Sequence, residues 1–374
     1  MNAHAHRHVA GSLAAPAPPF TASWRSAALV VGIGLALLVL LPSFLDDYTL
    51  LQVTVYVVMS ILSLSLAFVW GFGGILCFGQ AAFFGLGSYV YAIAVVNLGD
   101  SSVPLLLSIV LPALFAALLG YVIFYGRLSD VYMGVITLTV TLILFNLVNS
   151  TAGPEWKIGN APLGGFNGIP AIPPLNWPGN LDDTITPRGM FNLSLGALIA
   201  IYAGLRWMIA GRVGHVIVAI KENEQRSLLL GYDARAYKLF AFTLGGAIAG
   251  LAGCLFANWG AFTSPTVFGL AQSAQIIIWV IVGGLGTLVG PIVGCMLIQW
   301  LTTVIGTQQT VNANLVLGAI LVVFVLLVPR GLVPSLGDLL ARLRPKPGKP
   351  RAKKATDDGA HPPAAVRMES GGAA

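Results

Sequence analysis

The stretch Gly71–Ala92, GFGGILCFGQAAFFGLGSYVYA, is as apolar as a membrane helix, yet it contains six glycines and one glutamine. Glycine weakens an isolated helix. In a bilayer, however, helices associate by close packing, and small residues let their backbones approach one another. The dense cluster Gly71–Gly74 predicts something more than packing, namely a broken helix or re-entrant turn. Such a break is tolerated only beside a cavity or inside protein.

The composition of the whole chain is that of an integral membrane protein. Of its 374 residues, 56% are hydrophobic and only 9% are charged, and the mean hydropathy is +0.84. A soluble domain has about 25% charged residues. The predicted fold is therefore all-α, a polytopic bundle of about ten transmembrane helices, each near the length that crosses a core of about 30 Å. The predicted spans are residues 27–44, 49–70, 76–97, 104–125, 131–150, 191–208, 239–257, 271–288, 291–305 and 313–328. The short VGP sequence at 289–291 leaves open whether spans eight and nine are both full crossings.

The charges between these spans predict an orientation. With a cytoplasmic N-terminus, Lys157 and Arg188 are the only basic residues outside, and the other 18 of the 20 Lys and Arg lie inside. This asymmetry predicts that both termini are cytoplasmic, in a bacterial inner membrane. The predicted domains are a cytoplasmic N-terminal tail (1–26), a transmembrane permease domain (27–329) and a basic, disordered cytoplasmic tail (330–374). The tail either contacts anionic membrane lipid or only keeps the protein soluble.

Several kinds of chemistry are missing from the sequence. No Asp, Glu, Lys, Arg or His lies well inside a predicted span, although proton relays and buried catalysis need such groups. The three cysteines stand singly in apolar segments, so no metal site is predicted. There is no phosphate-binding G-x-x-x-x-G-K-[ST] loop either. The chain is therefore predicted to be no enzyme and to hold no cofactor, and any ATP hydrolysis would occur in a partner subunit.

Neutral polar residues inside the spans are candidates for a translocation pathway. Two threonines share one face of the fifth span, and two glutamines stand in the third and eighth. The alternative is that the threonines bond only to their own backbone and that the glycines only pack. A second glycine-rich stretch, Gly283–Gly294, lies in the other half of the chain and suggests an internal repeat around a pathway. The predicted pathway residues are Gln80, Phe83, Phe84, Thr137, Thr141 and Gln275, with the two phenylalanines as gates.

Two loops are long enough to have functions of their own. The external loop, residues 151–189, contains apolar and aromatic residues and is predicted to form a folded cap rather than an inert spacer. The cytoplasmic loop, residues 211–238, is predicted to contain one helix, Val213–Leu230. In that helix Glu222 and Arg226 stand four residues apart in the favourable order. Gly231 is predicted to end it.

Three stretches together resemble one family. They are Gly71–Ala92, residues 211–253 and residues 283–297, and they resemble the permease subunits of ABC importers for branched-chain amino acids, of the LivM type. The resemblance covers about residues 50–331, with Cys77 and Ser88 as small departures. Urea and amide permeases share the pattern. The resemblance implies a fold related to the vitamin-B12 importer permease. It also implies three kinds of partner: a homologous second permease subunit, cytoplasmic ATPase subunits and a soluble substrate-binding protein.

The family's ATPase-contacting segment corresponds to residues 219–238 here. A short helix carrying both charged and apolar residues suits a helix-in-groove contact, although it would also suit a helix lying at the lipid interface. The predicted coupling residues are Lys221, Glu222, Glu224, Arg226, Leu229 and Gly231.

The expected function is import of branched-chain amino acids or a similar small polar solute, delivered by the binding protein. The alternatives are a urea or short-chain amide importer, a stand-alone secondary transporter and a structural membrane scaffold. Nucleic acid is not an expected partner, because the positive charge lies in the loops of one membrane side and in the tail.

Overall fold

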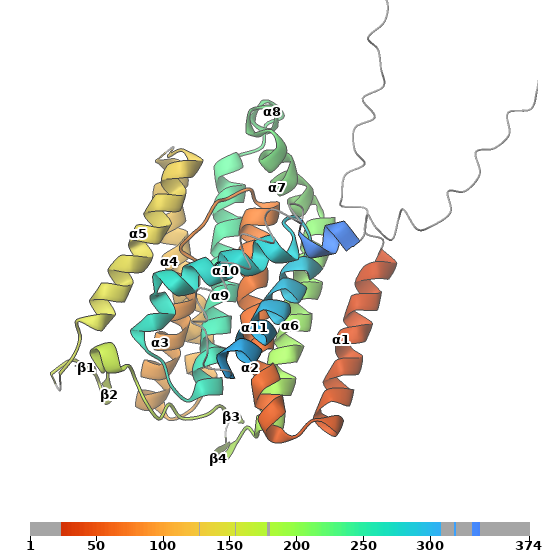
Figure 1. The fold of residues 1–374 in the computed structure, drawn as a ribbon. Helices are drawn as coiled ribbons and strands as arrows, with labels where there is room; N and C mark the ends of the chain where they lie inside the picture. The colour runs from red at the N-terminus through yellow and green to blue at the C-terminus, as the bar shows by residue number, and fades with distance from the viewer. Residues whose placement is uncertain are drawn as a thin grey trace, which may run out of the picture.

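The computed structural model describes residues 24–126, 128–153, 155–177, 180–307, 318 and 331–336. Within these ranges the chain is a bundle of α-helices (Figure 1). Eight helices are long and apolar enough to cross a membrane. They are α1 Trp24–Phe44, α2 Asp47–Leu66, α3 Gln80–Leu98, α4 Ser102–Tyr125, α5 Asp130–Asn149, α6 Pro187–Ala210, α9 Ala234–Gly260 and α11 Val289–Thr307. They match the first seven predicted spans and the ninth, so the predicted all-α membrane bundle is confirmed. Apart from residue 318, the tenth predicted span lies outside the described residues.

Helices α2, α3 and α9 form the centre of the bundle. In its most apolar window α2 is 78% buried, whereas α1, which packs at the edge against α6, is 6% buried. Helix α3 packs against both α4 and α9, which also pack against each other. All three cysteines are buried and unpaired, as expected for small packing residues.

Glycines set the distance between the central helices. A methyl group on Gly253 of α9 would overlap the backbone carbonyl oxygen of Phe84 on α3. One on Gly87 of α3 would overlap the carbonyl oxygen of Gly250 on α9. Backbone therefore meets backbone along the α3–α9 contact, as small residues allow between membrane helices.

The end of the bundle that holds the short strands is called the hairpin end here. Two hairpins lie there, β1 Lys157–Ile158 with β2 Ala161–Pro162, and β3 Asn176–Trp177 with β4 Asn180–Thr184, together with the short helix η2 Gly165–Asn167. Ile169, Ile172 and Leu175 of the same loop are buried against the bundle. Ile169 also pairs with Thr263 in an isolated β-bridge. The predicted folded cap is therefore present, and the loop is not a loose spacer.

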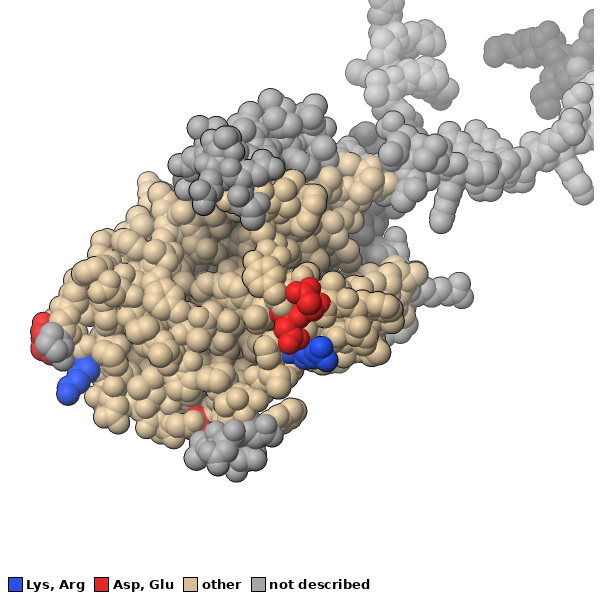
Figure 2. Space-filling view, turned by 60° about the horizontal axis from the view of Figure 1, so that its bottom comes forward, with Lys and Arg blue, Asp and Glu red and all other residues tan. Residues whose placement is uncertain are grey.

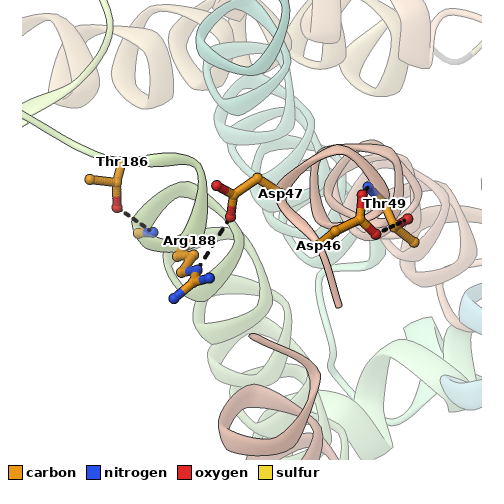
Figure 3. Close-up of polar contacts among 6 residues, drawn as sticks. Asp46, Asp47, Thr49, Thr186 and Arg188 are labelled. Atoms are coloured by element: carbon orange, nitrogen blue, oxygen red, sulfur yellow. Dashed lines mark hydrogen bonds and ion pairs between the residues drawn. The ribbon is translucent and has the colours of Figure 1, made fainter. Parts of the chain in front are cut away.

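The hairpin end has few charged groups (Figure 2). Two of them join the first turns of α2 and α6, where Arg188 Nε lies 3.3 Å from Asp47 Oδ1 (Figure 3). Beside them, the Thr49 hydroxyl donates a 2.6 Å hydrogen bond to Asp46, the N-cap of α2. This bond holds the pKa of Asp46 below its usual range. At the start of α6, the Thr186 hydroxyl caps the helix by accepting from Gly189 N.

The opposite end, called the α8 end, carries two short helices, α7 Arg212–Glu222 and α8 Glu224–Leu229. The prediction of one helix over Val213–Leu230 was wrong, because Asn223 adopts an extended conformation and breaks it. The Asn223 side chain then caps α8 by accepting from Arg226 N at 2.8 Å. The break also puts Glu222 and Arg226 in different helices. The ion pair that the structure shows here is instead between Glu224 and Lys238, whose Nζ lies 2.7 Å from Glu224 Oε2. Gly231, at φ +88°, ends α8 as predicted.

The eighth predicted span differs from a regular helix. Helix α10, Leu270–Gly283, has 14 residues and follows the short helix η3 Pro265–Phe268. Fourteen residues of α-helix are about 21 Å long, short of a core of about 30 Å. The chain nevertheless runs from the β-bridge of Thr263 at the hairpin end to Gly286 at the α8 end. The predicted helix over 271–288 was thus too long at its end, because Gly284 and Gly286 adopt positive φ values.

Both ends of the described chain lie at the α8 end. A cavity of about 230 Å³ there is lined by Ser26 and Val30 of α1, by Arg206 of α6 and by Val333. The start of α1 and the short helical segment 332–336 are therefore close in space, as Figure 1 also shows.

Candidate functional site

The predicted interruption at Gly71–Gly74 is present in the structure. Helix α2 continues into a π-helical turn, η1 Ala67–Phe72. The amide of Ile75, which would bond to the carbonyl of Gly71 in a regular α-helix, instead donates to Val69 O at 3.1 Å. Gly74 then turns the chain at φ +69°, a conformation that favours glycine. The carbonyl of Gly71 is consequently left without its usual helical donor.

The segment after the interruption is held by α5. The amide of Phe78 donates to the Thr137 hydroxyl at 3.2 Å, and a Cβ on Gly79 would lie 2.6 Å from Thr137 O. The Thr137 hydroxyl also donates to Gly134 O, and that of Thr141 donates to Thr137 O. Both threonines thus bond to their own helix, and Thr137 additionally anchors the broken segment.

Gln80 begins α3 just beyond the interruption. Its side chain is buried, and Nε2 donates to Ser65 Oγ on α2 at 2.8 Å and to Gly245 O on α9 at 3.1 Å. Its Oε1 is buried without a hydrogen-bond partner among the described residues. Gln80 therefore ties three central helices together and keeps one acceptor available.

The two predicted gate residues are packed inside the bundle. The Phe83 ring lies edge-on to Phe242 at 5.4 Å between centroids, and Phe84 lies against Phe256 at the same distance. Gln275, on α10, is only partly buried. Three cavities in the described part of the chain, two at the α8 end and one beside β3, are lined by residues other than these six. The pathway role of the six predicted residues stays a prediction.

We expect Gln80→Leu to lower stability while preserving the fold. Leucine keeps the apolar volume but removes both Nε2 bonds, at a cost of about 1–2 kcal/mol in total. The measurement is the thermal unfolding midpoint of the purified protein in detergent. Asn146→Leu is the control, because that amide bonds only to its own helix, at Leu142 O. Equal midpoints for the two variants would contradict the structural role of Gln80.

The second glycine-rich stretch meets the first. A Cβ on Gly71 would lie 3.1 Å from the backbone nitrogen of Gly286, in the turn 284–288 between α10 and α11. In that turn the Thr287 hydroxyl accepts from Gly290 N and caps the start of α11. The two interruptions, more than 200 residues apart in the sequence, thus touch at the α8 end. Their positions in the two halves were predicted, but their contact was not.

Helix α7 brings a cation to the same place. Lys221 Nζ donates to Gly71 O at 2.6 Å, and its aliphatic stem lies against Gly74. A cavity of about 460 Å³ opens beside this contact, between η1, the end of α7 and Leu285. We call the place where η1, the turn 284–288 and Lys221 meet the junction. Sequence reasoning assigned Lys221 to a partner contact and missed Trp70 and Leu285, which also line the cavity.

The tip of α8 exposes a group of apolar side chains. Leu229 is 88% and Leu230 72% exposed, and Leu228 and Tyr232 are also exposed. Helix α8 is the outermost element at its end of the bundle (Figure 1). An exposed apolar group at a protruding tip is typical of an interaction site.

These features define a class of protein. A bundle of apolar membrane helices with broken helices that meet near one end is the architecture of a multi-pass membrane transport protein. The chain belongs to the family described as the permease component of branched-chain amino acid transport systems, whose profile matches residues 48–326. The resemblance found from the sequence motifs is thereby confirmed.

Two curated relatives carry the same printed description, high-affinity branched-chain amino acid transport system permease protein LivM. The one from Escherichia coli K12 is 28% identical over 322 residues, covering 80% of this chain and 73% of the relative. The one from Salmonella typhimurium LT2 is 28% identical over 312 residues, covering 75% and 69%. No solved structure matches the chain.

Proposed function

We propose that this chain is the membrane-spanning permease subunit of an ATP-driven importer for branched-chain amino acids. The observation that carries the proposal is the family match over residues 48–326, together with the transport function that the LivM relatives' names state. ATP would be hydrolysed by partner subunits, because the sequence has no phosphate-binding loop of its own.

The α8 end is proposed to face the cytoplasm of a bacterial cell, with the hairpin end outside the inner membrane. The charge distribution supports this orientation through the positive-inside rule. At the hairpin end the loops carry more acidic than basic residues, and Lys157 and Arg188 are the only basic ones described there. At the α8 end the described basic residues include Arg206, Arg212, Lys221, Arg226, Arg235 and Lys238. In this orientation both termini are cytoplasmic.

Exposed surfaces of the bundle are assigned to the proposed partners. The apolar tip of α8 is the proposed contact for a cytoplasmic ATPase, in a helix-in-groove mode. The folded cap at the hairpin end is the proposed dock for the soluble binding protein. The exposed apolar faces of α4 and α5 are available to a second permease subunit and to lipid. Alternating access would then be a rigid-body movement of the bundle driven from α8.

Uptake of labelled leucine and labelled urea by cells that contain the complete transporter tests the proposal. The expected result is leucine uptake that requires the ATPase subunits and the binding protein. ATPase-dependent uptake of urea alone would favour the urea or amide alternative. Uptake that persists without the ATPase and follows an ion gradient would contradict the importer assignment and favour a secondary transporter.

A further inference from the structure

A polar bond from Lys221, on helix α7, reaches the broken end of α2. Lys221 Nζ donates to Gly71 O, the carbonyl whose usual donor, the Ile75 amide, has turned to Val69. A cation near the C-terminal end of a helix is favourable, because the last carbonyls lack partners and the helix dipole is negative there. The ammonium of Lys221 therefore completes the end of η1 from another element.

The loop side of this bond is firmly anchored. Ile220, the residue before Lys221, is buried with Val216 and Ala234, so the last turn of α7 is packed on the start of α9. Glu224, just beyond the break at Asn223, is bonded to Lys238 on α9. Lys221 consequently moves with α7 and the start of α9 as a unit.

The other side of the bond leads into the bundle. Gly71 lies against the backbone of Gly286, and Gly74 lies against the stem of Lys221. A displacement of Gly71 is thus passed directly to the turn between α10 and α11, and along η1 to α2. The neighbouring cavity of about 460 Å³ provides room for such a displacement.

We propose that Lys221 is a positioning residue that transmits movement of the α7–α8 loop to both interrupted helices through its bond to the Gly71 carbonyl. This inference rests on the proposed function, because the movement is attributed to the partner ATPase. It differs from a docking role, since it assigns the ammonium of Lys221 to an acceptor within this chain.

The test compares Lys221→Met, which keeps the stem and loses the ammonium, with Lys221→Arg, which restores a donor. Arg212→Met is the matched control, because Arg212 is also a basic residue of α7 but is exposed at the first turn of that helix, away from η1. In the complete transporter, we expect Lys221→Met to keep its ATPase partner through purification and to hydrolyse ATP. Its uptake of leucine should fall about fivefold or more, the lower range of coupling between sites. Lys221→Arg should recover uptake, and Arg212→Met should transport like the parent.

A second measurement reports the proposed movement of the interrupted helix directly. A reporter cysteine at Leu76, which lies just beyond the interruption and is partly buried, is treated with a maleimide with and without ATP. Its labelling rate should respond to ATP in the parent and not in Lys221→Met. Parent-like uptake or an unchanged ATP response in Lys221→Met would overturn the proposal. So would a loss of Lys221→Met from the membrane or from its ATPase, because the bond would then serve folding or docking. ATP-independent uptake by the parent would instead refute the proposed function.

Discussion

Leu229→Asp is expected to abolish transport while the permease stays folded in the membrane. Leu229 is 88% exposed and belongs to the apolar tip of α8, so its loss leaves the core of the bundle unchanged. A carboxylate in an apolar groove would have to give up its hydration without a partner, which is costly. We expect binding of the ATPase, and uptake with it, to fall at least about tenfold, which corresponds to about 1.4 kcal/mol. Co-purification of the ATPase with the tagged permease measures ATPase binding, and uptake of labelled leucine measures transport.

Leu98→Asp is the control for this experiment. Leu98 is 57% exposed at the last turn of α3, at the hairpin end, so it places the same new charge far from α8. It should keep the ATPase through purification. If Leu229→Asp also kept its ATPase and its uptake, the proposed contact at the tip of α8 would be wrong. Of the predicted coupling residues, only Lys221 at the junction would then keep a proposed role.

Gly253→Ala is expected to prevent stable assembly of the bundle. The added methyl group would overlap Phe84 O and lie 2.8 Å from Ser88 N, and both are backbone atoms of α3 that cannot rotate away. Helices α3 and α9 would have to separate, and the packing and hydrogen bonds between them would weaken. Overpacking of this kind costs about 3 kcal/mol or more. The measurement is the amount of monodisperse protein after extraction in mild detergent, together with its thermal unfolding midpoint.

The control, Gly260→Ala, is on the same helix. A Cβ on Gly260 would meet no atom within 4 Å, so the same chemical change adds a methyl group without a clash. Its yield and midpoint should equal or exceed those of the parent, since alanine favours helix more than glycine does. Similar yields for the two variants would show that the α3–α9 contact is looser than the structure indicates.

The long helices could be predicted from hydropathy because each is apolar over nearly its whole length. The prediction was wrong where local chemistry interrupts that pattern. Helix α10 stops at Gly283 because the following glycines adopt backbone angles that a helix does not allow, and hydropathy is blind to such angles. The break at Asn223 has a signal that was overlooked, since Asn favours the N-cap position and Glu224 follows in the first turn. The spacing of Glu222 and Arg226, four residues apart across the break, instead favoured one continuous helix.

The candidate site likewise has features that could be predicted from the sequence and others that could not. The interruption at Gly71–Gly74 was predictable, because no packing stripe requires glycines so close together. Gln80 was singled out by its depth and polarity, but its bonds to Ser65 and Gly245 depend on three helices that meet only in the folded chain. The bond from Lys221 to Gly71 was not predictable, because the acceptor is a backbone carbonyl that carries no mark in the sequence.

The contact between Gly71 and Gly286 also bears on how this protein tolerates mutation. Two backbone segments without side chains are in contact there, and a Cβ on Gly71 would lie 3.1 Å from the nitrogen of Gly286. Gly286 has open space around it but a φ of +84°, which penalises any larger residue. Every amino-acid substitution at either glycine adds at least one carbon atom. Substitution of Gly71 is opposed by steric contact, and substitution of Gly286 is opposed by backbone strain. Substitutions that tune transport are therefore expected to accumulate around this pair of glycines rather than at them.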